Sequence, residues 1–265
     1  MNILVAFKVC PNLDLLQAED LMVREEMGVD THFLPNVINC YDESSLELAL
    51  RLRDQATPLE LPIVLSALTI GGAHTEEYLK TLKALGYDHT IRVVAQDAAL
   101  RFRPEAVAHT IASYAMETEQ TVIFMGAEAP LGNHGVAAQL TSVLTGYPLL
   151  ASVTDVAIAE NGAITVCARD GERTLRQIVT PPCVLSVGNA VVSKLRVPTL
   201  RARMQCKSIP CEAYDLAAGE TGLCPAPDSL EIPDRSRQGY VSAQHGADAV
   251  EDVYRHALHE RLVAL

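Results

Sequence analysis

Short apolar runs alternate with amphipathic segments from the start of the chain to Pro148. Four of the runs are long enough to form strands: 2–9, 61–72, 89–95 and 121–126. Their nearly continuous hydrophobicity is typical of parallel strands that are buried on both faces. Four segments carry apolar residues at helical spacing: 42–56, 73–87, 104–119 and 137–146. The pattern therefore predicts βαβ units, in which helices cover both faces of a parallel sheet.

Three residues mark the expected helix ends. Asp42 precedes the leucine-rich stretch of the first helix, and we interpret it as the N-cap. Gly86 follows the second helix and is expected to stop it. Pro104 opens the third helix, at a position where the missing N–H costs nothing.

The pattern changes after Pro148. Apolar runs rich in β-branched residues are separated by "ENG" and "RDGE", and N-G and D-G are strong hairpin signals. We expect antiparallel hairpins that extend the parallel sheet. From residue 206 the chain reads as an irregular arm that ends in an amphipathic helix, "DAVEDVYRHALHERLVAL". The predicted organisation is an α/β core over 1–205, with the arm and C-terminal helix over 206–265.

Composition and charge exclude several classes of protein. Half of the chain is hydrophobic (49%) and only 20% is charged, as in a well-packed globular protein. The formal charge of −12 argues against nonspecific nucleic-acid binding, which depends on Lys and Arg. One basic island interrupts this acidic chain, either as a solvated face or as a docking surface: Lys194, Arg196, Arg201, Arg203 and Lys207.

The cysteines and the apolar runs bear on metals and compartment. Seven cysteines are scattered without a C-x-x-C pair, so we expect no metal site. No apolar run reaches the roughly 20 residues of a membrane span. The first residues lack a cleavage site, and free thiols fit a reducing compartment, so a cytoplasmic location is expected.

Ligands of an open parallel sheet bind beyond the carboxyl ends of the strands. The loops expected there are 8–12, 70–73 and 126–136, together with "NCYDE" at 39–43. Gly132 and Gly135 would let a phosphate approach the backbone ahead of a helix. Because neither a P-loop nor G-x-G-x-x-G is present, a phosphate cradle and a plain turn are both open. His134 beside the glycines could act as an acid–base group or a phosphate ligand, but no residue pattern compels a catalytic role.

Taken together, these segments resemble the β subunit of electron-transfer flavoproteins. "ILVAFKVCPN" is similar to the opening V-K-x-V-P-D strand of that family, and "NCYDESSLELALRLRD" to N-P-[FY]-D-E-x-A-L-E-x-A-L-R-L. "LTIGGAHTEEYLKTLKALGYDHTIRV" and "ITVCARDGERTLRQIVTPPCVLSV" resemble two later signatures. The likeness covers about residues 2–210 in order and spacing.

The resemblance implies an adenine-nucleotide-hydrolase-like α/β fold and an α-subunit partner that holds most of the redox FAD. The β subunit would bind AMP or a second FAD. The basic stretch from Lys194 to Lys207 would dock a dehydrogenase or another redox partner, and the arm and final helix would wrap the α subunit. Carried over by position, the nucleotide contacts would be Ala6, Lys8, Asn39, Cys40, Tyr41, Asp42, Ile70, Gly126, Gly132, Asn133, His134, Gly135, Val136 and Ala137.

The chain departs from the family pattern in the phosphate loop. Leu131 to Asn133 occupy the place of the family's acidic stretch, Val136 and Ala138 take the Gln and Gly places, and Cys40 replaces Pro. Binding would then rely on backbone N–H groups, Asn133 and His134. Whether AMP, FAD or no nucleotide is held stays open.

The leading hypothesis is a non-catalytic β subunit of an electron-transfer flavoprotein-like heterodimer. The alternative is a standalone adenine-nucleotide sensor of the universal-stress type, because "GNHG" gives a G-x-x-G. Against it, Gly146 lies one residue beyond the expected spacing, and Tyr147 follows where Ser or Thr is expected. Nucleotidyl transfer on the same sheet would need H-x-G-H, which the chain lacks.

Overall fold

The computed structural model describes residues 1–17, 20, 23–24, 28–95, 100, 103–130, 135–159, 161–215 and 240–263. The chain forms two compact units, Met1–Ala226 and Pro227–Leu265. The first unit is built on a nine-stranded sheet with the order β11-β10-β9-β12-β8-β1-β6-β7-β13.

The four strands predicted from the apolar runs are confirmed. They are β1 (Asn2–Ala6), β6 (Val64–Gly71), β7 (His89–Val94) and β8 (Val122–Gly126). All four run parallel, so their carboxyl ends lie at one edge of the sheet. The chain adds β6 and β7 on one side of β1, then crosses back to place β8 on the other side. The ends of β1 and β8 are therefore a topological switch point, the usual ligand position in such sheets.

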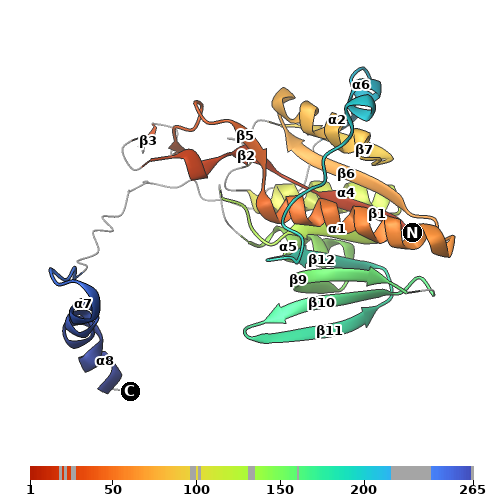
Figure 1. Ribbon diagram of the computed structural model, residues 1–265. Helices are drawn as coiled ribbons and strands as arrows, with labels where there is room; N and C mark the ends of the chain where they lie inside the picture. Colours follow the sequence, from red (N-terminus) through yellow and green to blue (C-terminus); the bar gives the residue numbers. More distant parts are fainter. Residues whose placement is uncertain are drawn as a thin grey trace. The chain divides into compact units, whose positions relative to one another are not determined.

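Two helices cover each face of the sheet, as expected for an α/β fold (Figure 1). On one face α1 (Cys40–Ala56) and α2 (Glu76–Ala84) pack on Ile3 and Val5 of β1. On the other face α4 (Pro104–Glu117) and α5 (Ala137–Thr145) pack on Leu4 and Ala6. Successive residues of a strand point to opposite faces, which explains why the run at 2–9 is apolar throughout.

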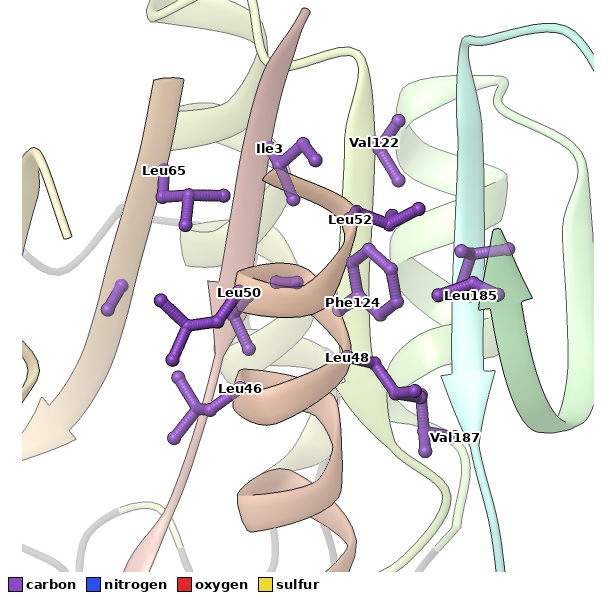
Figure 2. Close-up of a cluster of buried hydrophobic side chains, with 14 of the residues drawn as sticks. Ile3, Leu46, Leu48, Leu50, Leu52, Leu65, Val122, Phe124, Leu185 and Val187 are labelled. Atoms are coloured by element: carbon purple, nitrogen blue, oxygen red, sulfur yellow. The ribbon is translucent and has the colours of Figure 1, made fainter. Parts of the chain in front are cut away.

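Helix α1 lies at the centre of the larger core cluster. Figure 2 shows its four leucines, Leu46, Leu48, Leu50 and Leu52, against Phe124 and its neighbours on the sheet. All four leucines are fully buried. Burial of each such side chain is worth about 1.5–3 kcal/mol, so this helix contributes strongly to the stability of the core.

The two predicted hairpins are also confirmed. β9 (Leu149–Ile158), β10 (Ile164–Asp170) and β11 (Arg173–Val179) pair antiparallel in sequence. Their turns contain Gly162 and Gly171, both at positive φ. β12 (Cys183–Val187) then returns between β8 and β9 and is parallel to both.

Several short elements were not predicted. β2 (Val9–Pro11) pairs with β5 (Asn36–Ile38), and β3 (Val23–Arg24) pairs with β4 (Gly28–Val29). α6 (Leu200–Cys206) lies within the basic island, and β13 (Glu212–Tyr214), in the segment expected to be irregular, adds an edge strand beside β7. Single helical turns occupy Leu13–Leu15 and Thr57–Leu59, and a third, at Ala73–Thr75, forms the start of the helix predicted over 73–87.

The expected N-cap role of Asp42 is wrong. α1 begins at Cys40 after Asn39, so Asp42 is the third helical residue. Its carboxylate accepts hydrogen bonds from the backbone N–H groups of Lys8, which follows the end of β1, and of Gly126, the last residue of β8. A local pattern cannot reveal such distant donors, and the acidic first turn resembled a cap.

The second unit contains the predicted C-terminal helix, as α7 (Gly246–Val253), a π-helical turn at Tyr254–Leu258 and α8 (His259–Val263). The hydroxyls of Tyr240 and Ser242 donate to Asp252, and the Tyr240 ring stacks on His256. These contacts fold residues 240–242 back onto the helix.

Candidate functional site

A cavity of about 220 Å³ opens at the carboxyl edge of the sheet, where β1, β6 and β8 end. Its position is the topological switch point described above, and α4 closes one side of it. Eight of the fourteen residues proposed from the sequence line this cavity: Ala6, Lys8, Asn39, Asp42, Ile70, Gly126, Gly135 and Ala137.

The other proposed residues are placed differently. Cys40 is exposed, Tyr41 is half-buried and Val136 is 38% exposed, and none of the three is in the cavity lining. Gly132, Asn133 and His134 lie outside the described residues. Of the loop at 126–136, the structure therefore describes residues 126–130 and 135–136.

The apolar wall of the cavity was missed by the sequence reasoning. It is formed mainly by Leu68, Met125, Val107 and Ile111. These side chains come from the ends of β6 and β8 and from α4, on the sheet face that carries the smaller core cluster. The alternation of the two faces along the strands could have identified Leu68 and Met125, and the i, i+4 spacing along the helix could have identified Val107 and Ile111.

Asp42 is the polar centre of the cavity floor. Its Oδ2 accepts from the Lys8 backbone N–H at 2.9 Å and from Asn39 Nδ2 at 3.1 Å. Its Oδ1 accepts from the Gly126 backbone N–H at 2.8 Å. Asn39 Nδ2 also donates to the Glu128 carbonyl at 2.8 Å. The carboxylate thus joins the ends of β1 and β8 to the first turn of α1.

Burial raises the pKa of Asp42 to about 6, because the residue is only 5% exposed and the charged form loses its hydration. The three N–H donors and the Lys8 cation act in the opposite direction and offset part of this effect. Burial also raises the pKa of the nearby Cys10 thiol to about 11, so this side chain is neutral near pH 7.

Gly126 is required by the closeness of these contacts. A Cβ at this position would overlap with Asp42 Oδ1 and would lie 3.0 Å from Tyr41 Cβ and 3.1 Å from Asn39 Nδ2. The conformation of Gly126 is not the reason, because its φ is not among the positive ones. The glycine at the end of "TVIFMG" therefore serves close approach of α1 to β8.

This arrangement suits a ligand with an apolar planar part and an anionic part. Leu68, Val107 and Met125 offer an apolar surface, while Lys8 supplies a cation at the same cavity. Gly135, at φ +62°, turns the chain into the N-terminus of α5. A helix N-terminus favours an anion through its free N–H groups and its dipole.

The basic island forms a second candidate surface, which is anchored to α1 through Arg196. The Arg196 guanidinium donates to Glu47 Oε1 at 2.7 Å and to Asp54 Oδ2 at 2.7 Å. These partners raise the pKa of Arg196 further. The Thr199 hydroxyl caps α6 by accepting from the Ala202 N–H.

Several large side chains that follow Arg196 in the sequence are exposed to solvent. Val197, Leu200 and Met204 are each at least 70% exposed, which is unusual for large apolar side chains. The cations Arg201, Arg203 and Lys207 are exposed beside them. An apolar cluster with a cationic border is typical of a protein-docking surface.

Metal-ligand clusters and membrane-spanning helices are both missing from the described part of the chain. No group of three or more His, Cys, Asp or Glu side chains could hold a metal ion there. Among the same residues, every helix is too short or too polar to cross a membrane.

Comparison with known proteins assigns the chain to a family. The family model of the electron transfer flavoprotein domain matches residues 27–218. The chain is 25% identical over 210 residues to electron transfer flavoprotein subunit beta of Bacillus subtilis (strain 168), covering 77% of this chain and 79% of the relative. It is 26% identical over 260 residues to the subunit of the same name from Methylophilus methylotrophus, covering 92% and 95%.

A further relative is the provisionally named electron transfer flavoprotein subunit YgcR of Escherichia coli (strain K12). The two are 28% identical over 207 residues, covering 77% of each chain. The family model includes Asp42, Gly126 and the basic island. The chain belongs to the electron transfer flavoprotein family, as a divergent member among its beta subunits.

Proposed function

We propose that the protein is the β subunit of an electron-transfer flavoprotein-like heterodimer that supports flavin-based electron transfer and binds an adenine nucleotide, AMP or FAD. The observation that carries the proposal is the cavity at the switch point of a sheet in a chain of this family. Bound flavin supplies the redox chemistry and is held largely by the α subunit.

The residues present fit an adenine nucleotide. The base would lie against the apolar wall of Leu68, Val107 and Met125, and Lys8 would face the anionic part. Asp42 would act through the shape of the floor, because both of its oxygens already accept backbone N–H groups, and Asn39 Nδ2 already donates to Asp42 and to the Glu128 carbonyl. The chain's own task in this proposal is to hold and orient, without a catalytic residue.

Two partners follow from the same proposal. The α subunit would bind along the chain and complete the flavin site. A dehydrogenase or another redox partner would dock on the stretch from Lys194 to Lys207. The exposed apolar side chains and the cations beside them support this docking. The partner would then present an apolar patch that is bordered by acidic side chains.

Co-expression with an α subunit tests the heterodimer. A yellow complex of one α and one β subunit is expected, and mass spectrometry of the released ligands should find FAD together with AMP or with a second FAD. A colourless protein that does not associate with any α subunit would contradict the proposal. Membership of the flavoprotein family does not favour the sensor alternative, for which a homodimer that binds ATP unaided would be the sign.

A further inference from the structure

Asp42 connects parts of the chain that are far apart in sequence. Lys8 lies 34 residues before it and Gly126 lies 84 residues after it, yet both donate a backbone N–H to its carboxylate. Lys8, Asp42 and Gly126 all line the cavity. The carboxylate therefore sets the separation of the two strand ends between which a ligand enters.

We propose that Asp42 is a positioning residue for the nucleotide: its ionised carboxylate holds the ends of β1 and β8 in the binding geometry, and protonation of this carboxylate weakens ligand binding. The inference deepens the proposed function and rests on it.

The hydrogen-bond pattern explains why ionisation matters. An ionised carboxylate only accepts, and here it accepts from three N–H donors at 2.8–3.1 Å. A proton on Oδ1 would turn that oxygen into a donor and would compete with the Gly126 N–H. Gly126 also packs so closely against Asp42 that there is no room even for a Cβ between them. The added proton therefore cannot be accommodated unless the end of β8 moves. Protonation should therefore shift Gly126 relative to Lys8.

The charges around Asp42 define the expected pH range. Among the residues that the structure describes, the other titratable side chains in the cavity lining are Lys8, Cys10 and Glu128. Lys8 favours the ionised carboxylate of Asp42, whereas the Cys10 thiol stays neutral over this pH range. Since burial raises the pKa of Asp42 to about 6, the protonated form accumulates as the pH falls below that value.

Protonation of Asp42 also has an effect in the opposite direction. It removes a negative charge from the cavity, which would strengthen the binding of an anionic ligand. Lys8 offsets the Asp42 charge at this site, which limits the effect. Adenosine, which carries no phosphate, separates the two contributions. Its affinity reports the geometry of the floor alone.

The test compares Asp42→Asn with Asp88→Asn in the full chain, purified with its α subunit. Asp88 is a matched control, since its Oδ2 accepts the Leu65 N–H at 2.9 Å at the opposite, amino end of β6. AMP and adenosine affinities are measured by calorimetry between pH 5 and 8. The native chain should lose up to tenfold in affinity per pH unit below about 6, the limit for a single proton.

Asp42→Asn should bind both ligands at least tenfold more weakly at pH 7.5 and without the slope, while Asp88→Asn should follow the native chain. Equal affinity and equal slope for Asp42→Asn and the native chain would overturn the inference. If the native chain bound no adenine nucleotide at any pH, the proposed function would fail instead.

The positioning role has a readout that needs no ligand. The amide NMR signals of Lys8 and Gly126 should shift with pH in the native chain, with a midpoint near 6. The same signals should be displaced and independent of pH in Asp42→Asn. Amide signals that do not titrate in the native chain would refute the positioning role even in the absence of any nucleotide.

Discussion

The cavity floor and the basic island both depend on charged side chains, but they hold them in opposite ways. Asp42 is buried, and its two oxygens accept hydrogen bonds from three groups of the chain itself. Arg203 and Lys207 are exposed on the surface. A buried charge must be paired with fixed donors and so fixes geometry, whereas exposed charges act at a distance and are screened by salt.

Arg196 lies between these two cases, because it is partly exposed but is bound to a nearly buried carboxylate. Its side chain is 38% exposed, but it binds Glu47, whose side chain is only 8% exposed. The next residue, Val197, is 78% exposed. The anchor therefore holds a segment whose remaining side chains are available for a partner. The comparison predicts a steady decrease in the cost of substitutions from the cavity floor to the outer surface.

The largest loss of stability is expected for Gly126→Ala. The added Cβ would overlap with Asp42 Oδ1 and press on Tyr41 and Asn39, so the free energy of unfolding should fall by about 3 kcal/mol or more. Denaturant unfolding measures it. Gly188→Ala is the control, because its nearest neighbour would be Ser152 Cα at an ordinary 3.7 Å. Equal losses for the two variants would show that the floor is not closely packed.

The second prediction concerns the cost of the buried carboxylate. Because the pKa of Asp42 is raised from 3.8 to about 6, the folded chain binds this proton more tightly than the unfolded chain does. The stability from Asp42 is full below pH 3.8 and is lost as the pH rises through 6, a change of about 3 kcal/mol. The free energy of unfolding, measured at several pH values for the native chain and for Asp42→Asn, isolates this change.

Parallel pH curves for the two proteins would contradict the second prediction. If it holds, the ligand-free fold prefers the protonated carboxyl, whereas the proposed ligand prefers the ionised one. The floor would then carry an energetic cost that serves the site, which is common where function and stability compete.

Much of this fold could be predicted from the pattern of apolar residues. The strands β1, β6, β7 and β8 are continuous apolar runs. A short run of that kind between turn signals is typical of a strand buried on both faces. The hairpins followed from N-G and D-G, whose turns need residues that accept positive φ. These signals are local, so a single segment contains them completely.

The floor of the site could be predicted only in part. Asp42 was proposed as a ligand contact but was also interpreted as a helix cap, and its actual donors, Lys8 and Gly126, are distant in sequence. The α6 helix was missed although Thr199 is its N-cap, because the helix is only seven residues long and none of its residues is buried. Interactions between residues far apart in sequence cannot be read from the pattern of a single segment.

The third prediction tests the anchor between the two regions. Arg196→Ala leaves the nearly buried Glu47 carboxylate without its main partner. Such a loss costs 3–5 kcal/mol when both groups are buried, but the exposure of Arg196 reduces it to about 1–2 kcal/mol. Thermal and denaturant unfolding should show it. Arg201→Ala, on the exposed face of α6, should change stability by less than about 0.5 kcal/mol. Indistinguishable effects would remove Arg196 as an anchor.

The smallest effect on stability, and the most specific effect on function, is expected for the double variant Arg203→Glu and Lys207→Glu. Both side chains are exposed, so unfolding should be unchanged within about 0.5 kcal/mol. If the basic island docks an acidic partner, reversal of two charges should slow association with the dehydrogenase by about tenfold at low salt, and less at high salt. Stopped-flow measurement of flavin reduction in the purified complex reports this rate.

Charge reversal elsewhere distinguishes local docking from the total charge. Arg173→Glu with Arg176→Glu makes the same change on the exposed strand β11, at the other end of the sheet from β7 and β13. A docking surface on α6 requires that the α6 variant be slowed much more than the β11 variant. Equal slowing would mean that the net charge alone governs the encounter, and the exposed Val197, Leu200 and Met204 would then need another explanation.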